Sequence, residues 1–351
     1  PQVHSIVRIM RIICEIVCPG VLLLGEVVME PDKVVPYFGS VEKPECHMLY
    51  NVTTMAATWN SVATKDIRLL RQQMNVVSSL PKDYVFLNYL RCHDDIGWGL
   101  DYPWLKQFGI DEVSHKKYLN DFLTGQYPGS FGELYNSDPE SGDARLCGTT
   151  ASLCGIEKAA YERDEEALKK AVRLDLMLHA YMLSQSGIPV IYSGDEIGQE
   201  NDYTYHENPK KWDDSRYLHR GSFRWDLEKK RSVKGSLQET IFEGIKKLES
   251  IRAQFPVFCT DAEVWTIDTW DDAVLGLVRR SGEEKLIALF NFSEFDKVAW
   301  INEEDGMYKD LISGRRLEAK GVQIPAYGVY WLMREKWDEK DTAVEHGEKS
   351  V

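Results

Sequence analysis

The amino-acid sequence predicts an α/β protein in which a parallel sheet or barrel is followed by a separate antiparallel β domain. Two observations support this prediction. Up to about residue 256, short apolar runs alternate with amphipathic helical segments, which is the pattern of βα units. From about residue 257 onward, apolar residues recur at every second position, which is typical of antiparallel strands joined by turns. As a prior, a chain of 351 residues contains about two domains.

The composition restricts the classes of partner and the cellular location. A formal net charge of −14 argues against binding to nucleic acid or to an anionic membrane surface, and it suits a neutral small substrate. No apolar run approaches the ~20 residues that a membrane-spanning helix needs. The seven cysteines show neither paired nor metal-binding spacing, so we expect free thiols and a reducing, cytoplasmic compartment. No feature of the sequence calls for a metal or another cofactor.

The first 90 residues are expected to contain two helices and three strands. Apolar residues recur at helical spacing in the first segment, and Pro19 with Gly20 ends it. The strands that follow are apolar almost throughout, as in a parallel sheet that is covered on both faces. In chain order we expect a helix at residues 3–17, a strand at 21–25, a strand at 47–51, a helix at 55–77 and a strand at 84–90.

Ionisable side chains directly follow two of these apolar strands. Glu26 comes after the strand at 21–25, and His93, Asp94 and Asp95 follow the strand at 84–90. Because the carboxyl ends of parallel strands form the active edge of α/β folds, these residues are active-site candidates. If Glu26 is buried, its pKa would be raised, as a general acid working near neutral pH requires. The alternatives are a surface salt bridge for Glu26 and a polar strand end that caps the next element.

Residues 95–163 break the alternation and are expected to form a long inserted loop. The segment is rich in Gly, Tyr, Trp, Asp and Ser, and it contains a Gly-Asp-Ala-Arg sequence that ends at Arg145. A loop of this length inside a compact domain is usually functional. Its aromatic rings and its central arginine would suit the walls of a sugar pocket, because sugar rings stack on aromatic faces. The alternative is an ordinary irregular subdomain.

The rest of the chain is expected to complete the α/β part and then to form the β domain. Asp195 and Glu196 follow an apolar strand, so acidic residues again lie at a carboxyl end. The highly charged tail, residues 334–351, is expected to be disordered. The expected helices lie at residues 165–186 and 240–255, and the expected strands at 187–193, 264–267, 273–280, 285–292 and 328–332.

Three motifs in this order resemble the α-amylase superfamily of glycoside hydrolases, and within it amylosucrase and related sucrose-active enzymes. They are LLLGEVV around Glu26, YLRCHDDIGW around His93 and GIPVIYSGDEIG at residues 187–198. The resemblance covers residues 1–333. It implies that residues 1–256 are the second half of a (β/α)8 TIM barrel, strands five to eight, and that residues 257–333 form an antiparallel β-sandwich domain.

The resemblance also implies roles for the candidate residues. Glu26 matches the family's acid/base residue, Asp94 the aspartate that stabilises the transition state, and His93 the histidine that contacts the sugar. The additional aspartate, Asp95, and the arginine of the GDAR sequence, Arg145, are the amylosucrase-like details, and we expect them at a fructosyl or acceptor subsite. Finally, Arg216, or less favourably Arg220, is a candidate for the floor of the glucose pocket.

The resemblance places the family's nucleophile outside this sequence. That residue is an Asp in an Arg-x-Asp context at the end of strand four, which would precede Pro1. The sequence Arg173-Leu174-Asp175 has the same spacing, but helical periodicity runs into it from residue 165, so we reject it. We therefore expect the chain by itself to be inactive, and we expect the two open edges of a half barrel to cause self-association.

The implied activity is retaining cleavage or transfer of α-glucosyl groups, with sucrose or an α-glucan oligosaccharide as substrate. Within the same class, the alternative is another α-glucosidase, α-amylase or trehalose-type activity. From a different class, the alternative is a non-catalytic homologue that serves as a binding or interaction module. The presence of Glu26, His93 and Asp94 favours an enzyme, because a purely structural descendant has no need of all three.

Overall fold

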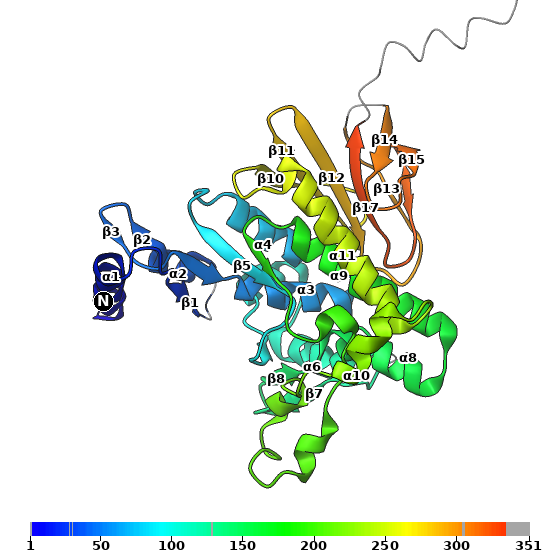
Figure 1. Cartoon of the computed structure of the whole chain (residues 1–351), viewed down its shortest axis with the longest axis horizontal. Coiled ribbons are helices and arrows are strands. Elements are labelled where there is room, and N and C mark those ends of the chain that lie inside the picture. Colours follow the sequence, from blue (N-terminus) through cyan, green and yellow to red (C-terminus); the bar gives the residue numbers. More distant parts are fainter. Residues whose placement is uncertain (1, 28, 30, 128, 304–305, 335–351) are drawn as a thin grey trace, which may run out of the picture.

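The computed structural model describes residues 2–27, 29, 31–127, 129–303 and 306–334. An α/β part contains a parallel sheet, and a second part is built on a large antiparallel sheet (Figure 1). Apart from Arg334, the tail that was expected to be disordered lies outside the described residues. Within those residues, every helix is too short or too polar to serve as a membrane-spanning segment.

A sheet of four parallel strands forms the centre of the α/β part, which confirms the predicted α/β class with a parallel sheet. The strand order is β1-β4-β5-β9, and each neighbouring pair is parallel. The strands are shorter than expected, and the first and last keep only two and three of their expected residues. Their bounds are β1 (Leu24–Gly25), β4 (Met48–Tyr50), β5 (Val85–Tyr89) and β9 (Ile188–Val190). The helix α2 (Pro31–Val34) and the hairpin of β2 (Gly39–Ser40) and β3 (Lys43–Pro44) connect β1 to β4.

Two long helices that the sequence predicted are confirmed, α9 (Glu165–Ser184) and α11 (Leu237–Gln254). The side chain of Asp164 caps α9 by accepting hydrogen bonds from the first free N–H groups of the helix. Asp175 lies inside α9, which confirms that it does not end a strand. Its carboxyl group is fully buried, and this burial raises its pKa to about 6 although the nearby His179 opposes the shift.

The single helix expected at residues 55–77 is wrong, because the chain forms two helices there. They are α3 (Val52–Thr64) and α4 (Arg68–Ser78). Between them Lys65 adopts a left-handed conformation with φ 60°, and the N–H of Ile67 donates to the carbonyl of Asp272 at 2.7 Å. The break therefore depends on a contact with the β domain, which local periodicity does not reveal.

The segment at residues 95–163 is also different from the expected long loop. It contains an antiparallel sheet in the order β6-β8-β7 and the twelve-residue helix α6 (Glu112–Leu123), which Asp111 caps. Apart from α6, the elements are too short for a clear period in the sequence. The strands are β6 (Ile96–Gly97), β7 (Glu133–Tyr135) and β8 (Arg145–Cys147), and the other helices of this region are α5 (Tyr102–Leu105), α7 (Thr150–Leu153) and α8 (Ile156–Glu162). Farther along, α10 (Trp225–Glu228) precedes α11.

The β domain consists of a six-stranded sheet and a smaller two-stranded sheet. Alternate residues of β12 point to two cores: Ala288 and Phe290 pack toward the helices, whereas Ile287 and Leu289 pack toward β13 and β16. The expected β-sandwich thus has two layers of very unequal size. The large sheet has the order β10 (Glu263–Ile267), β11 (Val274–Ser281), β12 (Glu284–Asn291), β17 (Val329–Arg334), β14 (Met307–Asp310), β15 (Arg316–Glu318), and the small one pairs β13 (Lys297–Ala299) with β16 (Val322–Ile324).

A fully buried arginine joins the β domain to the helices. Arg279 of β11 donates hydrogen bonds to the backbone carbonyls of Val257, Ser184 and Cys259. Burial, together with the nearby Arg252, lowers the pKa of Arg279 to about 9, so the guanidinium still carries its charge at neutral pH.

Replacing Arg279 by Met is expected to lower the free energy of unfolding by about 3 kcal/mol, because three buried carbonyls lose a charged donor. Urea unfolding measures this change. The neighbouring substitution Arg280→Met is the control, because Arg280 pairs with Glu263 at the surface and its loss should cost less than about 1 kcal/mol. Equal effects of the two substitutions would contradict the interpretation of Arg279.

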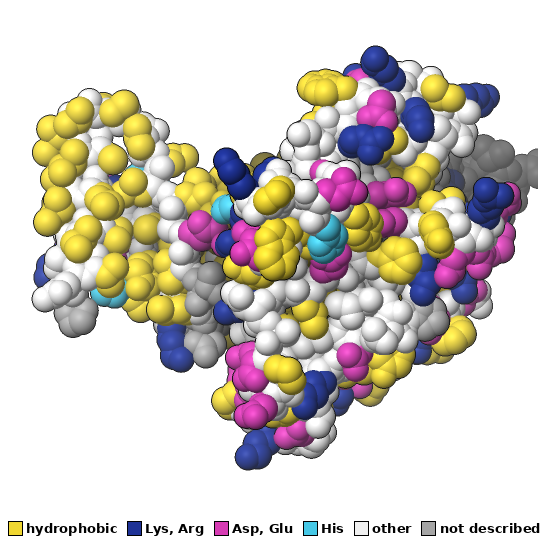
Figure 2. Space-filling view, turned by 90° about the horizontal axis from the view of Figure 1, so that it is seen from below, with side chains coloured by type: hydrophobic (Ala, Val, Ile, Leu, Met, Phe, Trp, Pro, Cys, Tyr) yellow, Lys and Arg dark blue, Asp and Glu magenta, His cyan; other side chains and the backbone are white. Residues whose placement is uncertain are grey.

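The helix α1 (Gln2–Val17) presents polar side chains to the protein and apolar side chains to solvent. The carboxylate of Glu45 is buried and bonds to His4 Nδ1 at 2.7 Å and to Arg8 Nε at 3.0 Å. Figure 2 shows hydrophobic side chains gathered over this end of the molecule. We call the exposed apolar side chains of α1 and of the segment up to β1 the apolar face. Its members are Val3, Ile6, Ile9, Met10, Ile12, Ile13, Ile16, Val17, Val21, Leu22 and Leu24.

Candidate active site

The carboxyl ends of β1 and β5 lie at the same edge of the parallel sheet and carry the candidate residues. Glu26 follows β1, and His93 follows β5 after a short extension. Only β4 lies between the two strands. As a result, the Nε2 atom of His93 is 4.0 Å from the Oε1 atom of Glu26, although the two residues are far apart in sequence.

Glu26 is not buried, since 46% of its side chain is exposed. β1 is an edge strand of the described sheet. Its own Leu24 is exposed, as are Val21 and Leu22, which precede it. The apolar character of this strand therefore predicted correctly that it pairs with β4. It did not predict that the side chains of the strand are exposed to solvent.

Two arginines converge on the carboxylate of Asp94. Arg216 Nη1 donates to Asp94 Oδ1 at 3.3 Å, and Arg220 Nη2 donates to the same oxygen at 3.4 Å. Arg216 is itself held by two hydrogen bonds to Asp214, at 2.8 and 2.9 Å, and it lies 5.0 Å from the centre of the Tyr135 ring. Both arginines that sequence reasoning considered for this region thus contact Asp94.

Asp95 and Arg145 also lie close together, with 3.8 Å between Arg145 Nε and Asp95 Oδ1. Asp95 is partly buried, and burial raises the pKa of its carboxyl group, with a further contribution from Asp94. Arg145 opposes this shift. The pairing of β6 with β8 positions Arg145 opposite Gly97, where a Cβ atom would lie 1.8 Å from Arg145 Nη1. A glycine at position 97 therefore leaves room for this guanidinium.

A neutral histidine supports the backbone of His93. His219 Nδ1 accepts a hydrogen bond from the N–H of Gly148 at 3.1 Å, so its Nε2–H is free to donate to the carbonyl of His93 at 3.3 Å. Burial, followed by the charge of Arg91, lowers the pKa of His219 to about 3. The imidazole is therefore uncharged at neutral pH, and its hydrogen bonds assign the tautomer. Sequence reasoning missed this residue.

Arg91 forms a buried ion pair behind the site instead of joining it. Its Nε atom donates to Asp195 Oδ1 at 2.8 Å, and its Nη1 atom donates to the carbonyl of His219 at 3.3 Å. The hydroxyl group of Thr150 donates to the other oxygen of Asp195 at 3.0 Å. Arg91 and Asp195 are each only 3% exposed, so the pair connects the ends of β5 and β9 without facing a ligand.

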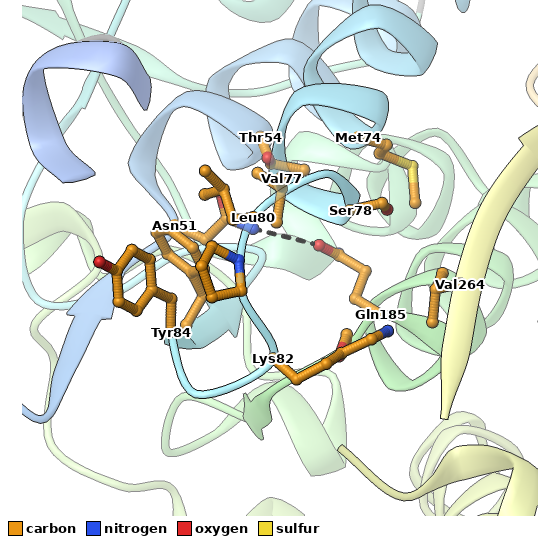
Figure 3. A pocket seen from close by; sticks show the side chains of 13 residues that line it. Asn51, Thr54, Met74, Val77, Ser78, Leu80, Lys82, Tyr84, Gln185 and Val264 are labelled. Atoms are coloured by element: carbon orange, nitrogen blue, oxygen red, sulfur yellow. Dashed lines mark hydrogen bonds between the residues drawn. The ribbon is translucent and has the colours of Figure 1, made fainter. Parts of the chain in front are cut away.

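Two cavities lie near opposite ends of the sheet, and among the described residues that line them there is no candidate residue. The cavity in Figure 3 lies at the other end of β5, among Tyr84, Gln185 and side chains of α3 and α4, and its volume of about 40 Å³ is too small for a sugar. A second cavity of about 270 Å³ lies at the carboxyl edge. Its lining residues are Met29, Lys33, Val52, Thr53, Ala56, Gly97 and Gly99.

One group of possible metal ligands exists among the described residues. A carboxylate oxygen of Glu26, the Sγ atom of Cys92 and a ring nitrogen of His93 all lie within 4.8 Å of one another. Because these residues come from two separate strand ends, the spacing of cysteines and histidines in the sequence does not indicate the group.

Known proteins are similar to this chain over nearly its whole length, although no family model matches it. Glucosylglycerate phosphorylase from Spirochaeta thermophila is 26% identical over 352 residues, covering 95% of this chain and 56% of the relative. Sucrose 6F-phosphate phosphorylase from Thermoanaerobacter thermosaccharolyticum has a TM-score of 0.60 at 15% identity, covering 91% of this chain and 56% of that one. AmyP in complex with maltose has a TM-score of 0.57 at 15% identity, with coverages of 90% and 56%.

The chain spans about half the length of the curated relatives that it matches along most of its own length. The similar solved structures are TIM-barrel enzymes of the α-amylase type, and at this level of identity they establish the fold alone. The curated relatives named above are enzymes that act on a glycoside, glucosylglycerate. The chain is therefore similar in sequence to glucosylglycerate phosphorylases, and in fold to α-amylases and to a sucrose 6F-phosphate phosphorylase.

Proposed function

We propose that the chain is part of a retaining enzyme that transfers α-glucosyl groups, with Glu26, His93 and Asp94 in its active site. The observation that carries the proposal is the short distance of 4.0 Å between Glu26 and His93 at the carboxyl edge of the sheet. Next to His93, Asp94 accepts hydrogen bonds from two arginines. This edge is where parallel α/β folds build their active sites.

The mechanism is a double displacement. Glu26 donates a proton to the glycosidic oxygen while an aspartate outside these 351 residues attacks the anomeric carbon, so the leaving group departs as an alcohol and a β-glucosyl enzyme forms. Glu26, now a carboxylate, then takes the proton of the acceptor, which displaces the aspartate. Asp94 hydrogen-bonds ring hydroxyls more strongly as positive charge develops on the sugar, and His93 donates to the same ring.

For the acceptor, we propose an anion, and inorganic phosphate first. Several similar proteins are named phosphorylases, and Arg145 is exposed and held only loosely by Asp95, so its guanidinium can turn toward an anion. Donors to be compared are sucrose, an α-glucan and glucosylglycerate. The second candidate is the amylosucrase-like reaction, in which water or a sugar hydroxyl is the acceptor, and it rests on the motif around Asp95.

We also propose that this chain corresponds to the second half of a (β/α)8 barrel, residues 1–256, followed by a β domain at 257–333. Four parallel strands and the coverage of about half of each relative support this division. Without the nucleophile the chain alone is inactive, and its apolar face promotes self-association.

The test is to express the longest protein encoded in frame with this chain and to incubate it with each donor, with and without inorganic phosphate. We expect glucose 1-phosphate to form only when phosphate is present, and no turnover by the 351-residue chain alone. Glucose or longer glucans without glucosyl phosphate would favour the second candidate. Failure of the longer protein to consume any α-glucoside would contradict an enzymatic function, and turnover by the short chain would contradict the missing nucleophile.

A further inference from the structure

We propose that Glu26, Cys92 and His93 form a binding site for Zn²⁺ or a chemically similar divalent cation. The three side chains offer an oxygen, a sulfur and a nitrogen donor, and these atoms lie within 4.8 Å of one another. Carboxylate, thiolate and imidazole are the three side-chain groups that bind Zn²⁺ in proteins. Three protein ligands with an open fourth position are the usual arrangement of a zinc ion that stays accessible to small molecules.

To accept the ion, the three ligand atoms, which lie within 4.8 Å of one another, must move closer by up to about 1.5 Å. Zinc–ligand bonds of about 2.0–2.3 Å in a tetrahedron place the ligand atoms roughly 3.3–3.8 Å apart. The observed separation of His93 Nε2 and Glu26 Oε1 is 4.0 Å, and both side chains are about half exposed, at 51% and 46%. These two side chains can therefore rotate toward the ion without disturbing the core. Cys92 is less exposed, so we expect its sulfur atom to stay in place.

The charges around Cys92 favour a cation. The N–H of Asp94 donates to Cys92 Sγ at 3.4 Å, and the carboxylate of Glu26 lies within 4.8 Å of the same sulfur atom. A divalent ion between them would offset the negative charge of the carboxylate and of the bound thiolate. Asp94 does not compete for the ion as a free carboxylate, since Arg216 and Arg220 already contact it.

Metal binding has a consequence that rests on the proposed function. An ion held by Glu26 and His93 occupies the acid/base residue and a sugar-contacting residue at once, so it would inhibit glucosyl transfer reversibly. Cys92 is the feature of this chain that turns a sugar site into a metal site, because a carboxylate and one imidazole alone bind Zn²⁺ weakly.

The experiment is a titration of the 351-residue chain with Co²⁺, which has the same charge as Zn²⁺ and gives a thiolate-to-metal absorption band only when a cysteine is bound. We expect the band to appear, to disappear on addition of Zn²⁺, and to be absent from Cys92→Ser. His93→Gln should weaken binding about tenfold or more. Because no substrate is involved, this result is independent of whether the enzyme is active.

Two matched controls separate this site from the other thiols. Cys14 of α1 and Cys18, which directly follows this helix, are four residues apart and could bind a metal together, so the double variant C14S/C18S must keep the band. Cys259→Ser, at an exposed position in another part of the molecule, must keep it too. Circular dichroism verifies that Cys92→Ser is folded, and His93→Gln, altered at an exposed position, provides the test if it is not. A band that survives Cys92→Ser, that is lost in C14S/C18S, or that never forms would overturn the proposal.

Discussion

Replacing Glu26 by Gln in the longest protein encoded in frame with this chain is expected to lower kcat/KM for an α-glucoside by about 10²- to 10⁴-fold. Gln cannot donate a proton to the glycosidic oxygen, and it cannot accept one from the acceptor. The loss should be much smaller for α-glucosyl fluoride, since fluoride leaves without a proton. Steady-state kinetics with both donors therefore distinguish a general acid from a residue that only binds the sugar.

Glu42→Gln is the matched control, because Glu42 lies in the exposed turn between β2 and β3 and should leave kcat/KM unchanged. Equal losses for the natural donor and for the fluoride would mean that Glu26 contributes through binding or folding. An unchanged kcat/KM would remove it from the mechanism altogether.

Replacing Arg91 by Met is expected to lower the free energy of unfolding by about 3–5 kcal/mol. Among the described residues, the substitution leaves the buried carboxylate of Asp195 with the hydroxyl group of Thr150 as its side-chain partner. An unpaired buried charge is far more costly than the loss of a surface pair. The carbonyl of His219 loses a donor at the same time. Urea unfolding followed by circular dichroism measures the change.

Arg224→Met provides the comparison, because Arg224 pairs with Asp226 where both side chains are more than half exposed, and its loss should cost less than about 1 kcal/mol. The double variant Arg91→Met/Asp195→Asn should recover part of the loss, since the amide carries no charge. If Arg91→Met and Arg224→Met destabilise equally, the buried pair does not have the role that its geometry indicates.

Much of the architecture could be predicted because it depends on local patterns. The helix α9 was predicted to within two residues at its end, since an unbroken helical period follows the capping Asp164. The strand β5 is apolar throughout and was predicted to within one residue at each end. By contrast, the break at Lys65 could not be predicted, because no glycine or proline marks it and the contact that accompanies it comes from Asp272 in the β domain.

The candidate site shows the same division between local and long-range information. Strand ends indicated Glu26, His93 and Asp94, because the position of a residue after a strand is a local property. The exposure of Glu26 depends on what covers β1, and the role of His219 depends on contacts with Gly148 and His93, which are distant in sequence. Such properties appear only when the segments are placed in space.

The helix α1 turns polar side chains toward the protein and apolar side chains toward solvent. Contacts made by these two sides should therefore respond differently to temperature. Hydrophobic association has almost no enthalpy near 25 °C and weakens on cooling, whereas the ion pairs of His4 and Arg8 with the buried Glu45 do not depend on this effect. Cooling should therefore disperse assemblies that form through the apolar face while α1 stays attached to the body. Working in the cold would separate the molecules from one another without detaching the helix.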